Sequence, residues 1–171
     1  RIKFYSEPHI YTIDNVPAPS ASTIISRFFP EFDSVCWSIR KAPQLGMTAI
    51  EVAKMWNNKG KVARDKGTFL HEQIENYYLG EEYSETEEFN LFKQFLEKHS
   101  DLEPYRSEWR IFDQKHNIAG TIDLLAKNGE NGFDIYDWKR SKKIINTFNG
   151  LPITTNQWQS GIGKLNKIDD T

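Results

Sequence analysis

Apolar and polar side chains alternate in part along residues 1–19, a pattern that predicts short strands. The pair Asp14-Asn15 is typical of a tight turn, so these strands should form a hairpin. After Ser20 and Ser22, either of which can cap a helix, apolar residues recur at helical spacing. The amino-terminal stretch therefore predicts a hairpin followed by a short helix.

The middle of the chain is predicted to be helical. Residues 33–60 have a helical pattern with breaks. From Thr68, a possible cap, an apolar stripe continues to Gly80, which should end that helix. A further helix is predicted over about 86–99, and its inward residues would be Phe89, Phe92 and Leu96.

Three short strands are predicted after the helices, over residues 107–113, 118–127 and 133–142. Their connections, QKHN and NGENG, are short and rich in turn-forming residues, which favours an antiparallel meander. No internal repeat and no linker divides the chain. We therefore expect a single domain over 1–171, with a helical part at about 17–100 and the meander at about 107–143.

The composition of the 171 residues fits a folded domain, because 38% are hydrophobic and 13% are aromatic. The 22 basic and 24 acidic residues give a net charge of −2, so nucleic acid would have to be bound through local patches. The single cysteine, Cys36, excludes a disulfide framework within the chain and a cysteine-rich zinc site, and it fits a reducing compartment. Because no apolar run reaches about 18 residues, we expect no membrane span. In keeping with a reducing compartment, we expect a cytoplasmic protein.

Charged residues occur within two of the predicted strands, where a buried unpaired charge is costly. Asp137 and Lys139 are two residues apart and should point the same way, and a hairpin turn would bring Asp123 beside Asp137. Two carboxylates at close range repel each other unless a cation lies between them. Lys139 supplies one positive charge, and carboxylate oxygens suit Mg²⁺ or Mn²⁺. We therefore predict a divalent metal site at one end of these strands.

The order of the polar residues matches a known pattern. The sequence contains G-T-F-L-H at 67–71, Glu108 in the strand before G-T-I-D at 120–123, and D-W-K at 137–139. This ordered set resembles the PD-(D/E)xK nucleases, and among them the RecB-type branch. The amino-terminal segment PHIYTIDNVPAPSASTII is similar to phage or large-virus members of that group.

The resemblance implies an α/β fold with a restriction-endonuclease-like core, in which helices flank a mixed central sheet. It also implies a DNA nuclease that uses Mg²⁺ or Mn²⁺ to hydrolyse phosphodiester bonds. Within this group we expect an exonuclease that acts on single-stranded ends, in a phage or viral replication or recombination machinery. The alternatives are a structure-selective endonuclease of the same superfamily and a DNA-binding module that no longer cuts.

The resemblance also assigns roles to single residues. The metal ligands that it implies are His71, Asp123, Asp137 and the backbone carbonyl of Trp138. Glu108 would hold a second metal ion or an ordered water. Lys139 would position the attacking water, help to deprotonate it and stabilise charge on the phosphate. The family's Gln on a helix after the D-x-K strand would be Gln157, with Gln159 as the alternative; no Tyr and no clear amphipathic helix accompany them, which indicates a divergent or incomplete last element.

Ordinary structural roles are open for the same residues. A histidine such as His71 is by default a packed residue with satisfied hydrogen bonds. Asp137 and Lys139 could form an exposed ion pair at a strand end. Glu108 could pair with Arg110. The structural surroundings of each residue decide between these roles.

A basic cluster lies shortly before His71 in the sequence. Its members are Lys54, Lys59, Lys61, Arg64 and Lys66, and the only acidic residue among them is Asp65. Two interpretations are open, a solvated helix face and a path for the phosphates of DNA. The P-loop pattern GxxxxGK[ST] is absent, so no nucleotide-binding loop is predicted.

Overall fold

The computed structural model describes residues 1–6, 9–28, 31–130, 132–141, 147–148 and 151–152 of the chain. They form two compact units, which are described separately. The amino-terminal unit contains Arg1–Glu31, Phe112–Gly120 and the described residues after Arg140, whereas the helical unit contains Phe32–Ile111 and Thr121–Arg140. Two strands contribute residues to both units, so the division does not follow a linker, and the single domain stays a prediction.

The amino-terminal unit is built on a three-stranded antiparallel sheet of β1 (Ile2–Tyr5), β2 (Ile10–Ile13) and β3 (Val16–Ala18). Asp14 and Asn15 form the turn between β2 and β3 with φ angles of 50° and 68°, the left-handed conformation that two-residue hairpin turns require. This confirms the predicted hairpin, and the structure adds a third strand. The buried core of the unit consists of Tyr11, Ile13, Ala18 and Ala119.

A short helix, α1 (Ala21–Ser26), follows the sheet. Ser20 caps it, because its hydroxyl accepts a hydrogen bond from the Thr23 N–H at 3.0 Å. Of the two serines left open by the sequence, Ser20 is therefore the cap. Ser20 also forms an isolated parallel bridge with Ala119, which joins the two chain segments of this unit.

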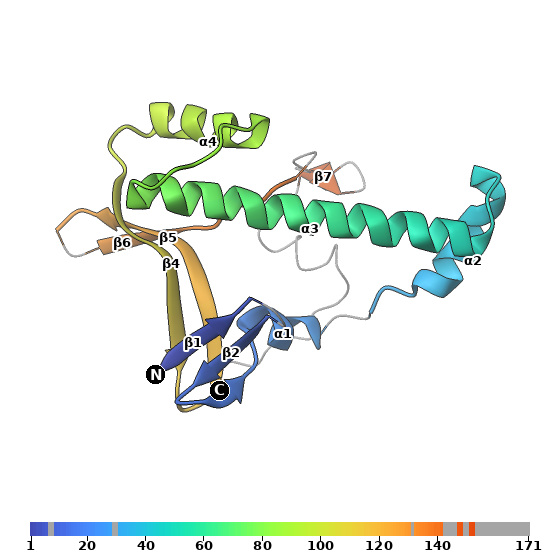
Figure 1. Cartoon of the computed structure of the whole chain (residues 1–171), viewed down its shortest axis with the longest axis horizontal. Helices are drawn as coiled ribbons and strands as arrows, with labels where there is room; N and C mark the ends of the chain where they lie inside the picture. Colours follow the sequence, from blue (N-terminus) through green and yellow to red (C-terminus); the bar gives the residue numbers. More distant parts are fainter. Residues whose placement is uncertain (7–8, 29–30, 131, 142–146, 149–150, 153–171) are drawn as a thin grey trace. The chain divides into compact units, whose positions relative to one another are not determined.

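Three helices form most of the helical unit: α2 (Ser34–Leu45), α3 (Ala49–Leu79) and α4 (Glu87–Lys98). α2 packs against the amino-terminal part of α3, and α4 lies along the carboxy-terminal part of α3 (Figure 1). As predicted, α3 ends at Gly80, which has a φ angle of 71° that glycine adopts without steric cost. The predicted helix over about 86–99 is also confirmed, with Thr86 as its cap.

Helix α3 begins earlier than the sequence predicts. Thr68 is not a cap but lies inside α3, and the cap is Thr48. The Thr48 hydroxyl accepts from the Glu51 N–H, and the Glu51 carboxylate accepts from the Thr48 N–H at 2.7 Å, which makes a capping box. Between the two threonines the chain contains no proline and many good helix formers. The helix therefore continues through Gly60 and Gly67, which cost only about 1 kcal/mol each.

The core of the helical unit joins α3 to α4. Leu70 and Ile74 of α3 are buried against Phe89 and Phe92 of α4. Partly buried residues packed around them are Tyr78, Tyr83, Leu96 and Trp138. The predicted inward residues of α4 are thus confirmed. Because Leu70 directly precedes His71, this packing also fixes the turn of α3 that carries His71.

A second sheet consists of β4 (Glu103–Asp113), β5 (Ile118–Asn128) and β6 (Gly132–Tyr136) in that order, which confirms the meander. A pair of short strands, β7 (Thr147–Phe148) and β8 (Leu151–Pro152), follows. In the described residues, every strand pair with a defined register is antiparallel. Because the chain contains both helices and strands, the α/β class is confirmed at the coarse level. The mixed central sheet is not seen in this part of the chain, and a nuclease-like core stays a prediction.

Helix α3 has 31 residues, a length that could cross a bilayer. Charged side chains recur along it, however, including the basic cluster. Within the described ranges, no helix combines the length and the apolar character that a membrane span needs.

We predict that Thr48→Ala lowers the free energy of unfolding by about 1 kcal/mol, because the first turn of α3 loses its cap. Thr68→Ala is the matched control, since Thr68 is an exposed residue inside the helix, where alanine is the better helix former. Urea unfolding followed by circular dichroism measures both variants. A larger loss for Thr68→Ala than for Thr48→Ala would contradict the observed start of α3.

Candidate metal centre

Glu108 lies in β4 in an unusual backbone conformation. Its φ angle is 43°, in the left-handed region that residues other than glycine adopt only rarely. Ser107, Glu108 and Trp109 are all half-buried, so the alternation of inward and outward side chains is interrupted here. Such interruptions occur at bulges, which re-aim a side chain next to a functional site. The conformation costs roughly 1–2 kcal/mol, so the rest of the unit must hold Glu108 in place.

Asp123 and Asp137 lie opposite each other at the end of the β5–β6 hairpin. Leu124 of β5 pairs with Tyr136 of β6, so the register continued by one residue places Asp123 opposite Asp137. The proximity predicted from the sequence is therefore observed, although β6 ends at Tyr136 and the D-W-K segment, Asp137–Lys139, lies just beyond it. The Trp138 N–H donates to Asp123 Oδ2 at 2.7 Å and holds this segment against β5.

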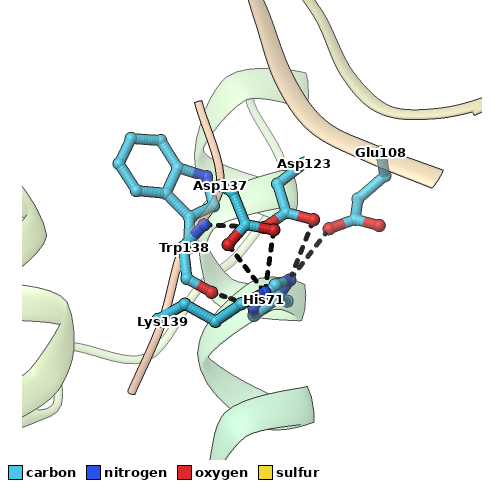
Figure 2. Close-up of polar contacts among 6 residues, drawn as sticks. All are labelled: His71, Glu108, Asp123, Asp137, Trp138 and Lys139. Atoms are coloured by element: carbon cyan, nitrogen blue, oxygen red, sulfur yellow. Dashed lines mark hydrogen bonds and ion pairs between the residues drawn. The ribbon is translucent and has the colours of Figure 1, made fainter. Parts of the chain in front are cut away.

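From α3, His71 reaches residues of β4, of β5 and of the D-W-K segment. Figure 2 shows its imidazole beside the side chains of Glu108 and Asp123 and the backbone of Trp138. Nε2 donates to the Trp138 carbonyl oxygen at 2.9 Å. Nδ1 lies 3.3 Å from Glu108 Oε1 and 3.7 Å from Asp123 Oδ1. The core-residue interpretation of His71 does not explain why two carboxylates converge on one ring nitrogen.

The hydrogen bond to Trp138 decides what the other nitrogen of His71 can do. A carbonyl oxygen only accepts, so Nε2 carries the proton of the neutral imidazole and the lone pair is on Nδ1. That lone pair faces the carboxylates of Glu108 and Asp123, and all three groups repel one another. The arrangement is therefore stable only when a proton or a metal ion lies at Nδ1.

The pKa values of this group have the direction that such repulsion predicts. The hydrogen bond with Glu108 raises the pKa of His71 above its ordinary value; burial opposes this, and the charge of Asp123 adds to it. Burial raises the pKa of Asp123. The hydrogen bond from the Trp138 N–H and the charge of His71 oppose this rise, whereas the charges of Asp137 and Glu108 add to it. The cluster thus holds an extra positive charge favourably.

The chemistry of these groups fits a divalent cation. In the described part of the chain, one group of possible metal ligands has atoms that all lie within 4.8 Å of one another. Its members are His71, Glu108 and Asp123, and all three side chains are half-buried. A cation there would accept the Nδ1 lone pair and offset both carboxylate charges. The carbonyl of Trp138 would then orient the imidazole through Nε2, the usual arrangement of a metal-binding histidine.

Two residues that the resemblance names as metal ligands are placed differently. The Trp138 carbonyl oxygen, an expected ligand, accepts the hydrogen bond from His71. Asp137 lies outside the three-residue group, and its carboxylate pairs with Lys139 Nζ at 2.7 Å. Both side chains of that pair are exposed, Asp137 by 57% and Lys139 by 75%, so they form the solvent side of the site. Gln157 and Gln159 lie outside the described residues.

The basic cluster is exposed along α3. Its residues, Lys54, Lys59, Lys61, Arg64 and Lys66, are all solvent-accessible, and within the described ranges none of them forms an ion pair shorter than 4 Å. Because α3 is continuous from Ala49 to Leu79, the cluster and His71 belong to one helix. The sequence pattern predicts a break between them at Thr68, whereas the structure places them on one continuous helix.

Three residues near the site are absent from the sequence prediction. Arg140, the residue after D-W-K, hydrogen-bonds to Glu88 of α4. Glu75 lies one turn beyond His71 on α3, and burial followed by the charge of Glu108 raises the pKa of its carboxyl. The spacing of four residues between His71 and Glu75 was a usable signal, because such residues share a helix face. The Arg140 contact joins distant segments and leaves no local signal.

Comparison of the chain with models of protein families, with curated protein sequences and with solved structures gave no match. The function therefore has to be inferred from the geometry of the site together with the sequence resemblance. The geometry contributes a histidine and two carboxylates that converge on one point, beside an exposed lysine.

We predict that Glu108→Gln lowers the pKa of His71 in protein treated with chelator, because the main hydrogen bond that raises it is weakened. NMR titration of the imidazole protons measures this, with His71→Asn used for assignment. Glu72→Gln is the matched control, since Glu72 is the exposed neighbour of His71 on α3 and lies outside the group. Equal shifts in both variants would contradict the specific contact.

The same shift predicts a pH dependence of stability. Because the pKa of His71 is higher in the folded state, protonation of His71 stabilises the fold fully below about pH 6.5, the pKa of an unperturbed histidine. This contribution is lost as pH rises through the raised pKa. The free energy of unfolding of metal-free protein should therefore fall as pH rises from about 6.5 through the raised pKa of His71. Added Mn²⁺, which competes with the same proton, should bind more tightly as pH rises.

Proposed function

We propose that the chain is a metal-dependent nuclease that hydrolyses phosphodiester bonds of DNA and prefers single-stranded ends. The observation that carries this proposal is the imidazole Nδ1 of His71 directed at two carboxylates, with the exposed Lys139 nearby. The order of these residues in the sequence matches the PD-(D/E)xK pattern. The three-stranded meander that carries Glu108 and Asp123 is consistent with the same proposal.

In this proposal His71, Glu108 and Asp123 hold Mg²⁺ or Mn²⁺. The imidazole favours Mn²⁺, because nitrogen is a softer ligand than oxygen. Bound there, the ion lowers the pKa of a water molecule and offsets negative charge on the phosphate. The Trp138 carbonyl keeps the imidazole oriented through Nε2, and the Trp138 N–H keeps the Asp123 carboxylate oriented through Oδ2.

Lys139 acts on the substrate side of this site. An ammonium group has only donors, so it is suited to a phosphate oxygen and not to a metal ion. Its ion pair with Asp137 keeps Nζ at the rim, where substrate would enter. The resemblance adds that Lys139 positions the attacking water and helps to deprotonate it.

The residues of the basic cluster lie on three faces of α3. Residues seven apart on a helix share a face, so Arg64 lies on the side of His71, about 10 Å along the axis. Lys59 and Lys66 are also seven apart, and they lie about 120–140° around the helix from His71. Lys54 and Lys61, again seven apart, lie about 80–100° around it in the opposite direction. Of the two interpretations of the cluster, the phosphate path therefore applies best to Arg64, whereas the solvated face applies to Lys59. The charge of Lys66 acts on Glu88 of α4.

The proposal is tested by incubating end-labelled single- and double-stranded DNA with Mg²⁺, Mn²⁺ or EDTA. We expect metal-dependent cleavage of single-stranded ends. A circular single strand distinguishes the alternatives, because an obligate exonuclease leaves it intact and an endonuclease opens it. If Mn²⁺ binds and DNA binds but no strand is cut, the chain is a binding module and the proposed activity is wrong.

We predict that Lys139→Ala lowers single-turnover cleavage by about two orders of magnitude, the usual effect of losing a general base or an electrostatic stabiliser. Mn²⁺ affinity should persist, because Lys139 is not a ligand. Asp123→Asn is the comparison variant and should lose metal and cleavage together. Parental cleavage by Lys139→Ala would show that the D-W-K match is coincidental.

We predict that Arg64→Glu weakens binding of single-stranded DNA and reduces its dependence on salt. Each phosphate neutralised on a single strand contributes about 0.7 log units of affinity per log unit of salt. Lys59→Glu makes the same charge change on a different face of α3 and is the matched control. Fluorescence anisotropy over a salt series measures both. Equal losses in the two variants would show that net charge, and not a defined path, governs binding.

A further inference from the structure

We propose that α4 holds the D-W-K segment in position through the ion pair between Glu88 and Arg140, which makes these two residues positioning residues for the nuclease site. This inference rests on the proposed function for its catalytic consequence. The positioning itself has a structural readout that does not require activity. The resemblance assigns no role to either residue.

The D-W-K segment needs support from outside the sheet. β6 ends at Tyr136, so Asp137, Trp138 and Lys139 follow the last residue of the strand ladder. The backbone contacts of Trp138 with Asp123 and His71 belong to the site itself. These contacts orient His71 and Asp123 correctly only when the segment stays where it is. Contacts that anchor the segment elsewhere therefore determine the geometry of the site.

Arg140 supplies such an anchor on one side of Lys139. Its Nε and Nη2 both lie 2.9 Å from Glu88 Oε1, so the guanidinium is held by two contacts to one oxygen. The pair is more protected than the exposed ion pairs of this chain, with 21% of the Arg140 side chain and 30% of the Glu88 side chain accessible. A charge-assisted contact with fixed geometry of this kind restrains the backbone of Arg140.

Glu88 is well placed to remain an anion. It lies in the first turn of α4, where free N–H groups and the helix dipole favour negative charge. Its own backbone N–H, then the hydrogen bond from Arg140, lower the pKa of its carboxyl, and the charge of Lys66 adds to this. The anchor point is therefore part of a rigid helix that is itself packed on α3 through Phe89 and Phe92.

The Trp138 ring supplies the anchor on the other side of Lys139. Its centroid lies 5.4 Å from that of Phe92 and 5.4 Å from that of Phe95, both on α4 and both near perpendicular to the indole. Lys139 thus lies between two residues that are fixed to the same helix, although its own side chain is exposed. The exposed lysine has a fixed backbone because its neighbours in the sequence are held.

Loss of the ion pair should displace the segment without removing any group that contacts the metal or the phosphate. A displacement of about 1 Å can lower the rate about 100-fold, so we expect kcat to fall about tenfold or more in Arg140→Gln and in Glu88→Gln. Mn²⁺ affinity and the KM for DNA should change by less than about threefold. Because the two residues act as one contact, the double variant should be no worse than either single variant.

The two variants separate positioning from a direct contact of Arg140 with DNA. If Arg140 contacts DNA directly, Arg140→Gln should raise KM and Glu88→Gln should not impair cleavage. That outcome would overturn the proposal. Exchange of the two charges, Glu88→Arg with Arg140→Glu, should recover part of kcat. The matched control is the ion pair of Lys93 on α4 with Glu85, which has a 2.7 Å contact and, in the described part of the chain, forms no hydrogen bond or ion pair with the D-W-K segment. Lys93→Gln should leave kcat within about threefold.

Hydrogen exchange at the Trp138 amide gives the readout that is independent of cleavage. This N–H donates to Asp123, so it should exchange faster in Arg140→Gln and in Glu88→Gln and at the parental rate in Lys93→Gln. Unchanged exchange in the first two variants would overturn the proposal. Faster exchange with parental kcat in an active enzyme would overturn the catalytic consequence. If the parental chain cuts no DNA, the proposed function fails, and exchange alone decides the positioning.

Discussion

The hydrogen bond from His71 to the Trp138 carbonyl is the interaction on which the candidate site depends. It fixes the tautomer of the imidazole and thereby directs the Nδ1 lone pair at Glu108 and Asp123. It joins α3, which supplies His71, to the segment after β6, which supplies the carbonyl, and the ring of Trp138 packs in turn on Phe92 and Phe95 of α4. Without this bond the neutral imidazole could carry its proton on Nδ1 and donate it to the carboxylates. Their convergence on Nδ1 would then need no cation.

Much of the fold could be predicted because its signals are local. A two-residue turn at Asp14-Asn15, a glycine at the end of a helix and the inward spacing of Phe89 and Phe92 each follow from neighbours in the sequence. The start of α3 could not be predicted in the same way. Both Thr48 and Thr68 are suitable caps, and only the uninterrupted helix between them decides which one is used.

The candidate site was predictable where the meander register determines it, and less so elsewhere. Short turns place Asp123 opposite Asp137. Whether Asp137 faces the imidazole or Lys139 depends on the path of the chain after β6, which no local pattern specifies. Likewise, the alternation of a strand predicts that Glu108 and Arg110 share a face, whereas the left-handed residue at 108 disrupts that alternation. These differences concentrate where the backbone leaves regular structure.

The left-handed conformation of Glu108 lowers the stability of the fold while it places a carboxylate in the candidate metal site. Glycine at position 108 would adopt the same backbone angle without strain, and asparagine would do so at lower cost than glutamate. Directed evolution for heat resistance alone would therefore tend to replace Glu108, and the winning variants would lack one carboxylate of the cluster. A library selected in the presence of Mn²⁺ should retain it, because ligand binding to the native state offsets the strain. The residue found at position 108 after such a selection would show whether metal binding or low backbone strain matters more there.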